Sequence, residues 1–180
     1  MSDDELHILG AHDKNLFNRW NTLRKLSFLA IENLISKGNP VSDRLLTSIA
    51  SIIYSNDYSY AYRAIIATPP NTKSILINLS NKDENIDPLK IHCAINLFNE
   101  TLAKKCNEFI LDYFNGSKPD IEELSGVEQA GLRAFSLKLM NLYCYEEGGI
   151  KSLKNLYQTA SNMTEELGAL KLLVQHDKVS

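Results

Sequence analysis

The sequence has few of the features that mark nucleic-acid-binding or membrane-spanning proteins. Its 180 residues include 19 Lys and Arg against 22 Asp and Glu, which gives a formal net charge of -3. Proteins that neutralise phosphates or adhere to anionic lipids need clustered basic side chains, so this balance argues against nucleic acid as a partner. No stretch approaches the roughly 20 apolar residues that cross a bilayer. We therefore expect no membrane partner either.

Cysteine is scarce as well. The chain has Cys93, Cys106 and Cys144, an odd number at wide spacing with no CxxC pair. Each lies in an apolar periodic run, where a free thiol behaves as a small hydrophobic side chain. The acidic start, Ser2-Asp3-Asp4-Glu5, lacks the basic segment that opens a signal peptide. The sequence therefore predicts a protein of the reducing cytoplasm.

The motifs of common catalytic centres are also missing. The four histidines are His7, His12, His92 and His176. None belongs to an HExxH pattern, in which two imidazoles one turn apart hold zinc, and His7 with His12 favours plain surface over a metal site. Adjacent residues on a helix point about 100° apart, so His92 beside Cys93 predicts no catalytic pair. There is no GxSxG elbow, and Gly148-Gly149 indicates a helix end. We expect no catalytic residue, metal ligand or cofactor site in this chain.

What the sequence does contain is apolar residues at three- and four-residue spacing along most of its length, which is typical of amphipathic helices. Start and stop signals divide the pattern. They predict helices over 13–37, after Ser42, from Asp57 to Pro69-Pro70, after Thr72, over 87–115, from Ser125 to Gly148, over 150–160, and from Asn162 onward. Asp13 is the expected N-cap of the first, Pro88 the first residue of the fifth, and Asn162 with Glu165 a capping box.

The first twelve residues break this helical pattern. Leu6, Ile8 and Leu9 alternate imperfectly with polar residues before Gly10, like an edge strand whose partner is missing. Elsewhere no run of strands competes, and helices joined by short polar turns favour stacked helical pairs or an irregular bundle. The sequence predicts a residual strand or linker over 1–12 and an all-α helical-repeat domain over 13–180.

Several segments, taken in order, resemble a known family. They are Leu9-Gly10-Ala11-His12-Asp13, Phe17-Asn18-Arg19-Trp20, Ala67-Thr68-Pro69-Pro70, Ile86-Asp87-Pro88 with Ile91-His92, Ala130-Gly131-Leu132-Arg133, and Ala160-Ser161-Asn162-Met163-Thr164. The set is similar to the first part of the C-terminal helical domain of bacterial-type aminopeptidase N, of zinc metallopeptidase family M1. The Phe-Asn-Arg-Trp and Asn-Met-Thr segments are the most specific, because unusual residue types recur there in the right order.

The resemblance implies a superhelix of armadillo- or HEAT-like helical pairs that packs on a catalytic domain and encloses its substrate cavity. It implies that residues 1–12 leave a preceding β-sandwich, and that the helical domain continues past Ser180 in the family. The family's zinc-binding helix, distal glutamate ligand and transition-state tyrosine have no counterpart in this sequence. Zinc is thus expected in the parent enzyme and not in this chain, whose partner is the catalytic half, in cis or as a separate chain.

For the junction with that half, the candidates are Phe17, Arg19 and Trp20, although Phe17 and Trp20 could equally anchor the core of the first helix. If neighbouring parts are absent, apolar surface should be exposed at Leu6, Ile8 and Leu9 and on the last helix, and the chain could self-associate. Two alternative functions stay open: a stand-alone helical scaffold that binds a protein or peptide, and a gene relic.

Overall fold

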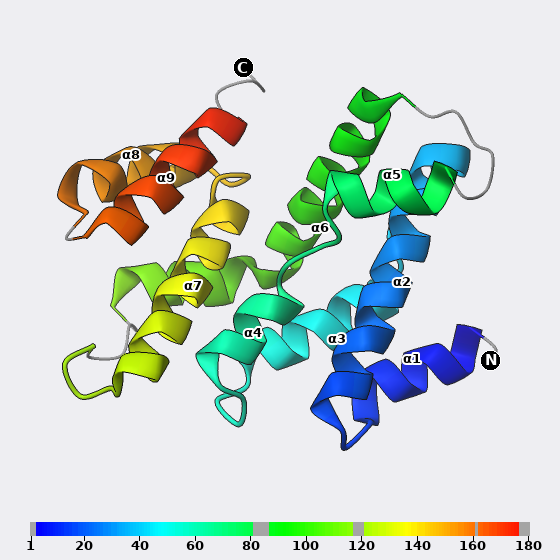
Figure 1. Ribbon diagram of the computed structural model, residues 1–180, viewed down its shortest axis with the longest axis horizontal. Coiled ribbons are helices and arrows are strands. Elements are labelled where there is room, and N and C mark those ends of the chain that lie inside the picture. The colour runs from blue at the N-terminus through cyan, green and yellow to red at the C-terminus, as the bar shows by residue number, and fades with distance from the viewer. Residues whose placement is uncertain (1–2, 81–86, 117–120, 161, 177–180) are drawn as a thin grey trace. The chain divides into compact units, whose positions relative to one another are not determined.

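The computed structural model describes residues 3–80, 87–116, 121–160 and 162–176, and these form helices without any strand. Ser2, Ile86 and Ser161 from the segments quoted above lie outside the described residues. The helices are α1 Asp3–His12, α2 Leu16–Lys37, α3 Asp43–Tyr54, α4 Tyr60–Ile66, α5 Thr72–Ser80, α6 Pro88–Asn115, α7 Gly126–Tyr143, α8 Gly149–Thr159 and α9 Met163–His176 (Figure 1). The predicted all-α class is confirmed.

Of the residual strand or linker predicted over residues 1–12, the strand is wrong for residues 3–12, because these form helix α1. Leu6, Leu9 and Gly10 share one helical face. A Cβ atom added to Gly10 would lie 2.9 Å from a methyl group of Leu23, so the glycine allows α1 to approach α2 closely. Ile8 lies on the other side and is exposed. The short apolar segment is compatible with the two-residue repeat of a strand and with the 3.6-residue repeat of a helix. Packing against α2 favours the helix.

Helix α2 begins at Leu16, and its N-cap lies two residues after the predicted Asp13. The N-cap is Asn15, whose Oδ1 accepts hydrogen bonds from the backbone N–H groups of Phe17 at 3.0 Å and Asn18 at 3.2 Å. Asp13 instead accepts the backbone N–H of Asn15 at 2.8 Å. The helix ends as predicted at Gly38, whose φ of 66° is the left-handed conformation that favours glycine.

Three other predicted helix starts are confirmed. Ser125 and Glu128 form a reciprocal capping box at the start of α7. Asp87 Oδ1 accepts the backbone N–H of Leu89 at 2.9 Å beside Pro88, the first residue of α6. Asn162 Oδ1 accepts the backbone N–H of Glu165 at 3.0 Å at the start of α9.

The chain divides into two compact units, residues 1–55 with 65–105, and residues 56–64 with 106–180. In the first unit, α1, α2 and α3 pack on one another. Its largest fully buried side chains are Ile31, Leu45, Ile49, Ile52, Ile53, Ile75, Ile91, Phe98 and Leu102. These residues come from α2, α3, α5 and the first part of α6, so one core holds these helices together.

In the second unit, α9 packs against α8 and α7. Met140, Cys144, Leu153 and Ala169 form a buried cluster there, covered by half-buried aromatic and aliphatic side chains of the same unit. A second part of this core surrounds Phe135, which is fully buried.

A buried arginine lies beside Phe135. Arg63, from α4, is 3% exposed, and its guanidinium carbon lies 4.3 Å from the ring centroid of Phe135, 5.4 Å from that of Tyr60 and 5.7 Å from that of Phe109. Burial lowers the pKa of Arg63 from its ordinary value, but an arginine stays charged at any physiological pH. The aromatic faces therefore stabilise a cation inside the unit.

Helices α4 and α7 touch at Gly131. A Cβ atom added there would lie 3.0 Å from the backbone nitrogen of Ala61, a contact that no side-chain rotation relieves. Gly126, at the start of the same helix, has nothing within 4 Å of the corresponding position.

We expect Gly131→Val to lower the free energy of unfolding by about 2 kcal/mol or more, because overpacking against backbone forces α4 and α7 apart. Gly126→Ala is the matched control and should leave stability within about 0.5 kcal/mol. Urea denaturation followed by circular dichroism measures both. Equal stability of the two variants would contradict the close approach.

For Arg63→Ala we expect a loss of about 3 kcal/mol in unfolding free energy, since the change removes the cation from its aromatic surroundings and leaves a cavity. Arg24→Ala is the control: its guanidinium lies 5.5 Å from the Trp20 ring centroid but the residue is exposed, so the loss should stay below about 1 kcal/mol. A Tm shift of similar size for both variants would show that burial of Arg63 contributes nothing.

Candidate interface surfaces

The three predicted junction residues lie in the first turns of α2, and two of them form one surface. Phe17 is 65% exposed, and its ring centroid lies 5.5 Å from that of Trp20, which is half-buried. Arg24 follows along the same face, over the Trp20 ring. Phe17 is therefore no core anchor, and the pair presents an aromatic surface from unit 1.

Arg19 points elsewhere. Its Nε donates a hydrogen bond to the carbonyl oxygen of Gly10 at 3.1 Å, and a second guanidinium nitrogen donates to the carbonyl of Ala11 at 2.5 Å. These carbonyls belong to the last turn of α1, where no intrahelical donor remains for them. Arg19 thus caps α1 and fixes its end against α2, a role that the sequence pattern did not predict.

An apolar groove of about 540 Å³ lies on unit 1 between α1, α2 and α5. Its lining residues are Leu6, Lys25, Phe28, Leu29, Glu32, Ser74, Ile77 and Asn78. Leu29 and Ile77 are exposed, and Asn78 Nδ2 donates to Glu32 Oε1. Sequence reasoning missed this groove, because it depends on where α5 lies against α1 and α2, which no periodic pattern encodes.

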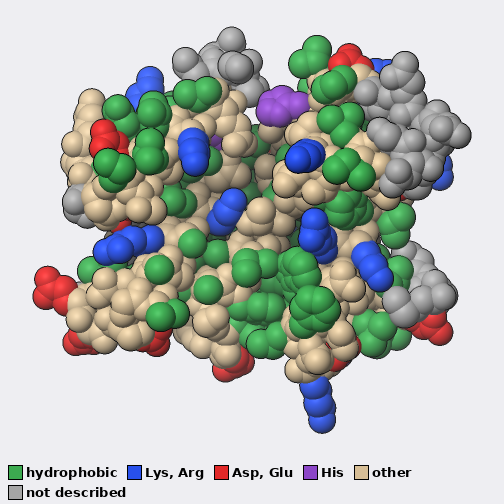
Figure 2. All heavy atoms as spheres, in the orientation of Figure 1, with side chains coloured by type: hydrophobic (Ala, Val, Ile, Leu, Met, Phe, Trp, Pro, Cys, Tyr) green, Lys and Arg blue, Asp and Glu red, His purple; other side chains and the backbone are tan. Residues whose placement is uncertain are grey.

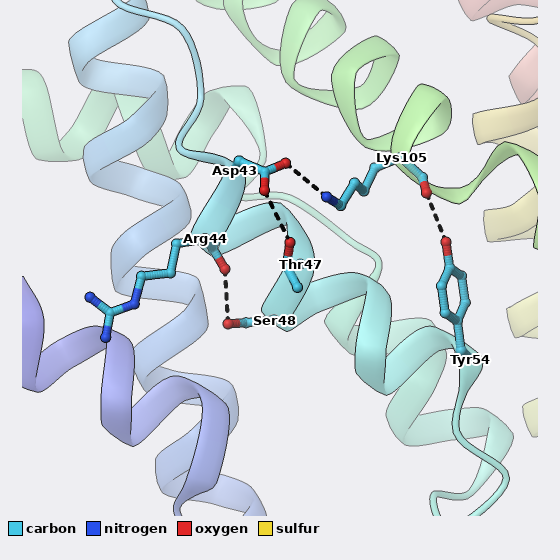
Figure 3. Close-up of polar contacts among 6 residues, drawn as sticks. All are labelled: Asp43, Arg44, Thr47, Ser48, Tyr54 and Lys105. Atoms are coloured by element: carbon cyan, nitrogen blue, oxygen red, sulfur yellow. Dashed lines mark hydrogen bonds and ion pairs between the residues drawn. The ribbon is translucent and has the colours of Figure 1, made fainter.

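Helix α3 makes polar contacts with two neighbouring helices of unit 1, and Figure 3 draws those with α6. Lys105 Nζ of α6 lies 2.8 Å from Asp43 Oδ1, and the Tyr54 hydroxyl donates to the Lys105 carbonyl at 2.8 Å. The hydrogen bond from Lys105 lowers the pKa of Asp43. On the other side Arg44 lies 2.8 Å from Asp4 of α1. These contacts connect α3 to α6 and α1 at the surface.

His7 and His12 both line a pocket of about 380 Å³ between α1 and α3. They are two potential ligands where zinc requires three or four. Among the described residues no group of three or more His, Cys, Asp or Glu side chains could hold a metal ion.

None of the three cysteines forms a disulfide, and they differ in their surroundings. Burial raises the pKa of the Cys144 thiol to about 12, so it stays protonated and is no nucleophile. Cys93 is exposed, although it lies in an apolar periodic run of the sequence. Its neighbour His92 interacts through Nε2 with the side-chain amide of Asn96, at 3.1 Å.

A further exposed apolar surface lies on α9, as the sequence predicted. Hydrophobic side chains reach the surface over this helix (Figure 2), and they are Met163, Leu167, Leu170 and Val174. Near the N-terminus the prediction holds for Ile8, whereas Leu6 and Leu9 are half-buried.

None of the helices in the described ranges is long and apolar enough to cross a membrane.

Comparison with solved structures identifies a protein of similar fold. The crystal structure of Legionella pneumophila aminopeptidase A in complex with aspartic acid matches with a TM-score of 0.79 and 21% sequence identity. The match covers 97% of this chain but 21% of that protein. The chain therefore spans about a fifth of the length of this relative.

Residues 3–180 match a family of helical repeats described as "Domain of unknown function (DUF3458_C) ARM repeats". This match agrees with the stacked helices, and it confirms the predicted armadillo-like class. The chain belongs to the DUF3458_C family of ARM-repeat domains.

Proposed function

We propose that this chain is a non-catalytic helical segment of an aminopeptidase of the aminopeptidase N type, which packs on the catalytic half and encloses its substrate cavity. The observation that carries the proposal is the fold match across 97% of the chain to one part of an aminopeptidase. The collinear sequence segments, Phe17-Asn18-Arg19-Trp20 above all, support the same relationship independently of the fold.

In this role the chain contributes a binding surface and no catalytic group. The catalytic zinc belongs to the partner half, whose active site the helices would wall off so that only peptides with a free amino terminus enter. Three cysteines without a disulfide support a reducing compartment such as the cytoplasm.

The exposed Phe17 and the half-buried Trp20 are the proposed contact with the catalytic half. Aromatic side chains bury a large area with few rotatable bonds and are common anchors of interfaces. Arg19 contributes indirectly, because its hydrogen bonds to Gly10 and Ala11 fix α1 beside this surface.

The test mixes the chain with the catalytic half of an aminopeptidase truncated before the matched region. We expect a one-to-one complex by calorimetry and increased stability of the catalytic half, with turnover of aminoacyl reporter substrates only where that half is present. Phe17→Asp should weaken binding at least about tenfold, as loss of a central aromatic anchor costs about 2 kcal/mol.

Leu89→Asp is the matched control, because Leu89 is 70% exposed on another helix and should bind as the unchanged chain does. Zinc-dependent turnover by the chain alone would refute a non-catalytic role. Absence of any complex would favour a stand-alone scaffold, for which the groove lined by Phe28 and Ile77 is the candidate surface.

A further inference from the structure

The exposed stripe on α9 has the spacing of a coiled-coil seam. Met163, Leu167, Leu170 and Val174 are 74%, 47%, 40% and 54% exposed, and they follow one another at intervals of four, three and four residues. In heptad notation Leu167 and Val174 occupy position a, and Met163 and Leu170 position d. Val174 at a and Leu170 at d are the combination typical of parallel two-stranded packing, whereas Leu167 at a and Met163 at d are apolar but carry no such preference.

The opposite face of α9 is already occupied within unit 2. Ala169 is fully buried in the cluster with Met140 and Leu153, and a Cβ atom added to Gly168 would lie 2.6 Å from a methyl group of Leu137. Packing on α7 and α8 therefore holds this short helix in shape before anything docks on it. A partner helix need not supply the cost of forming α9.

The charges beside the stripe indicate which partner fits. Glu166 occupies position g and Lys171 position e, and both are exposed. In a parallel pair of identical helices, the g residue of one chain faces the e residue of the next heptad in the other. Two copies of α9 would thus form two Glu166–Lys171 ion pairs, one on each side of the apolar seam.

We propose that two copies of this chain associate through α9, in parallel and about a twofold axis along the seam. The interface is self-complementary, because the same four apolar residues meet in the seam and Glu166 of each copy faces Lys171 of the other. Two heptads form a smaller surface than the about 800 Å² per partner of stable complexes. The dimer is therefore concentration-dependent. The inference does not rest on the proposed aminopeptidase function.

The first test is the mass of the full chain by sedimentation equilibrium from micromolar to near-millimolar concentration. We expect a monomer–dimer equilibrium, and Leu170→Lys should increase the dissociation constant at least about tenfold by placing a charge in the seam. Val127→Lys is the control, since Val127 is 82% exposed on α7 and should leave the equilibrium unchanged. Circular dichroism checks that both variants are folded.

The second test reverses the charges. Glu166→Lys places lysines opposite each other and Lys171→Glu places glutamates opposite each other, so each variant alone should dimerise less, by about tenfold at low salt. A mixture of the two should form a heterodimer, and the double variant should dimerise like the original chain. High salt should weaken these differences.

A monomer at all concentrations would overturn the proposal and would leave the stripe to a further helix of a longer chain or to a different protein. A dimer whose dissociation constant is unchanged by Leu170→Lys and by both charge reversals would also overturn it, because the contact would then lie on another surface. A mixture of the two single-charge variants that forms no heterodimer would exclude the parallel arrangement.

Discussion

Every helix in an ARM-type stack has apolar side chains on more than one face, and each of these faces has to be covered by a neighbouring helix. This requirement organises both units. In α9, Ala169 is covered by α7 and α8, while the stripe ending at Val174 remains exposed. At the other end of the sequence, Leu6 and Leu9 turn toward α2 and Ile8 stays exposed. The surfaces of interest are those where helix stacking leaves an apolar face uncovered.

Local hydrogen-bonding chemistry explains why most helix boundaries could be predicted. The signals act on backbone groups only a few residues away. Helix starts are capped by Ser125 with Glu128 and by Asp87 before Pro88, and α2 ends at Gly38. Such signals can be recognised in a sequence because they need no partner that is distant along the chain. The prediction of a strand failed for residues 3–12 for the opposite reason. Whether this segment forms a strand or a helix depends on Leu23, which packs against Gly10 from the next helix.

The candidate surfaces were only partly predictable, for a similar reason. The resemblance named Phe17 and Trp20 as junction candidates, but the separate role of Arg19 depends on where the last carbonyls of α1 lie. The groove beside Ile77 and the buried cation at Arg63 also require long-range packing. Residue type alone places Arg63 at the surface, and only the three surrounding rings explain its burial.

Helix α6 has a consequence for how the molecule unfolds. Its residues 88–105 belong to the first unit and 106–115 to the second, so one continuous run of backbone hydrogen bonds is shared between two cores. When either core unfolds, its part of α6 loses the contacts that stabilise it. Fraying of the helix then reaches the part of α6 that is still packed in the other core. The two cores are thus thermodynamically coupled through the helix they share, and neither has a stability wholly independent of the other.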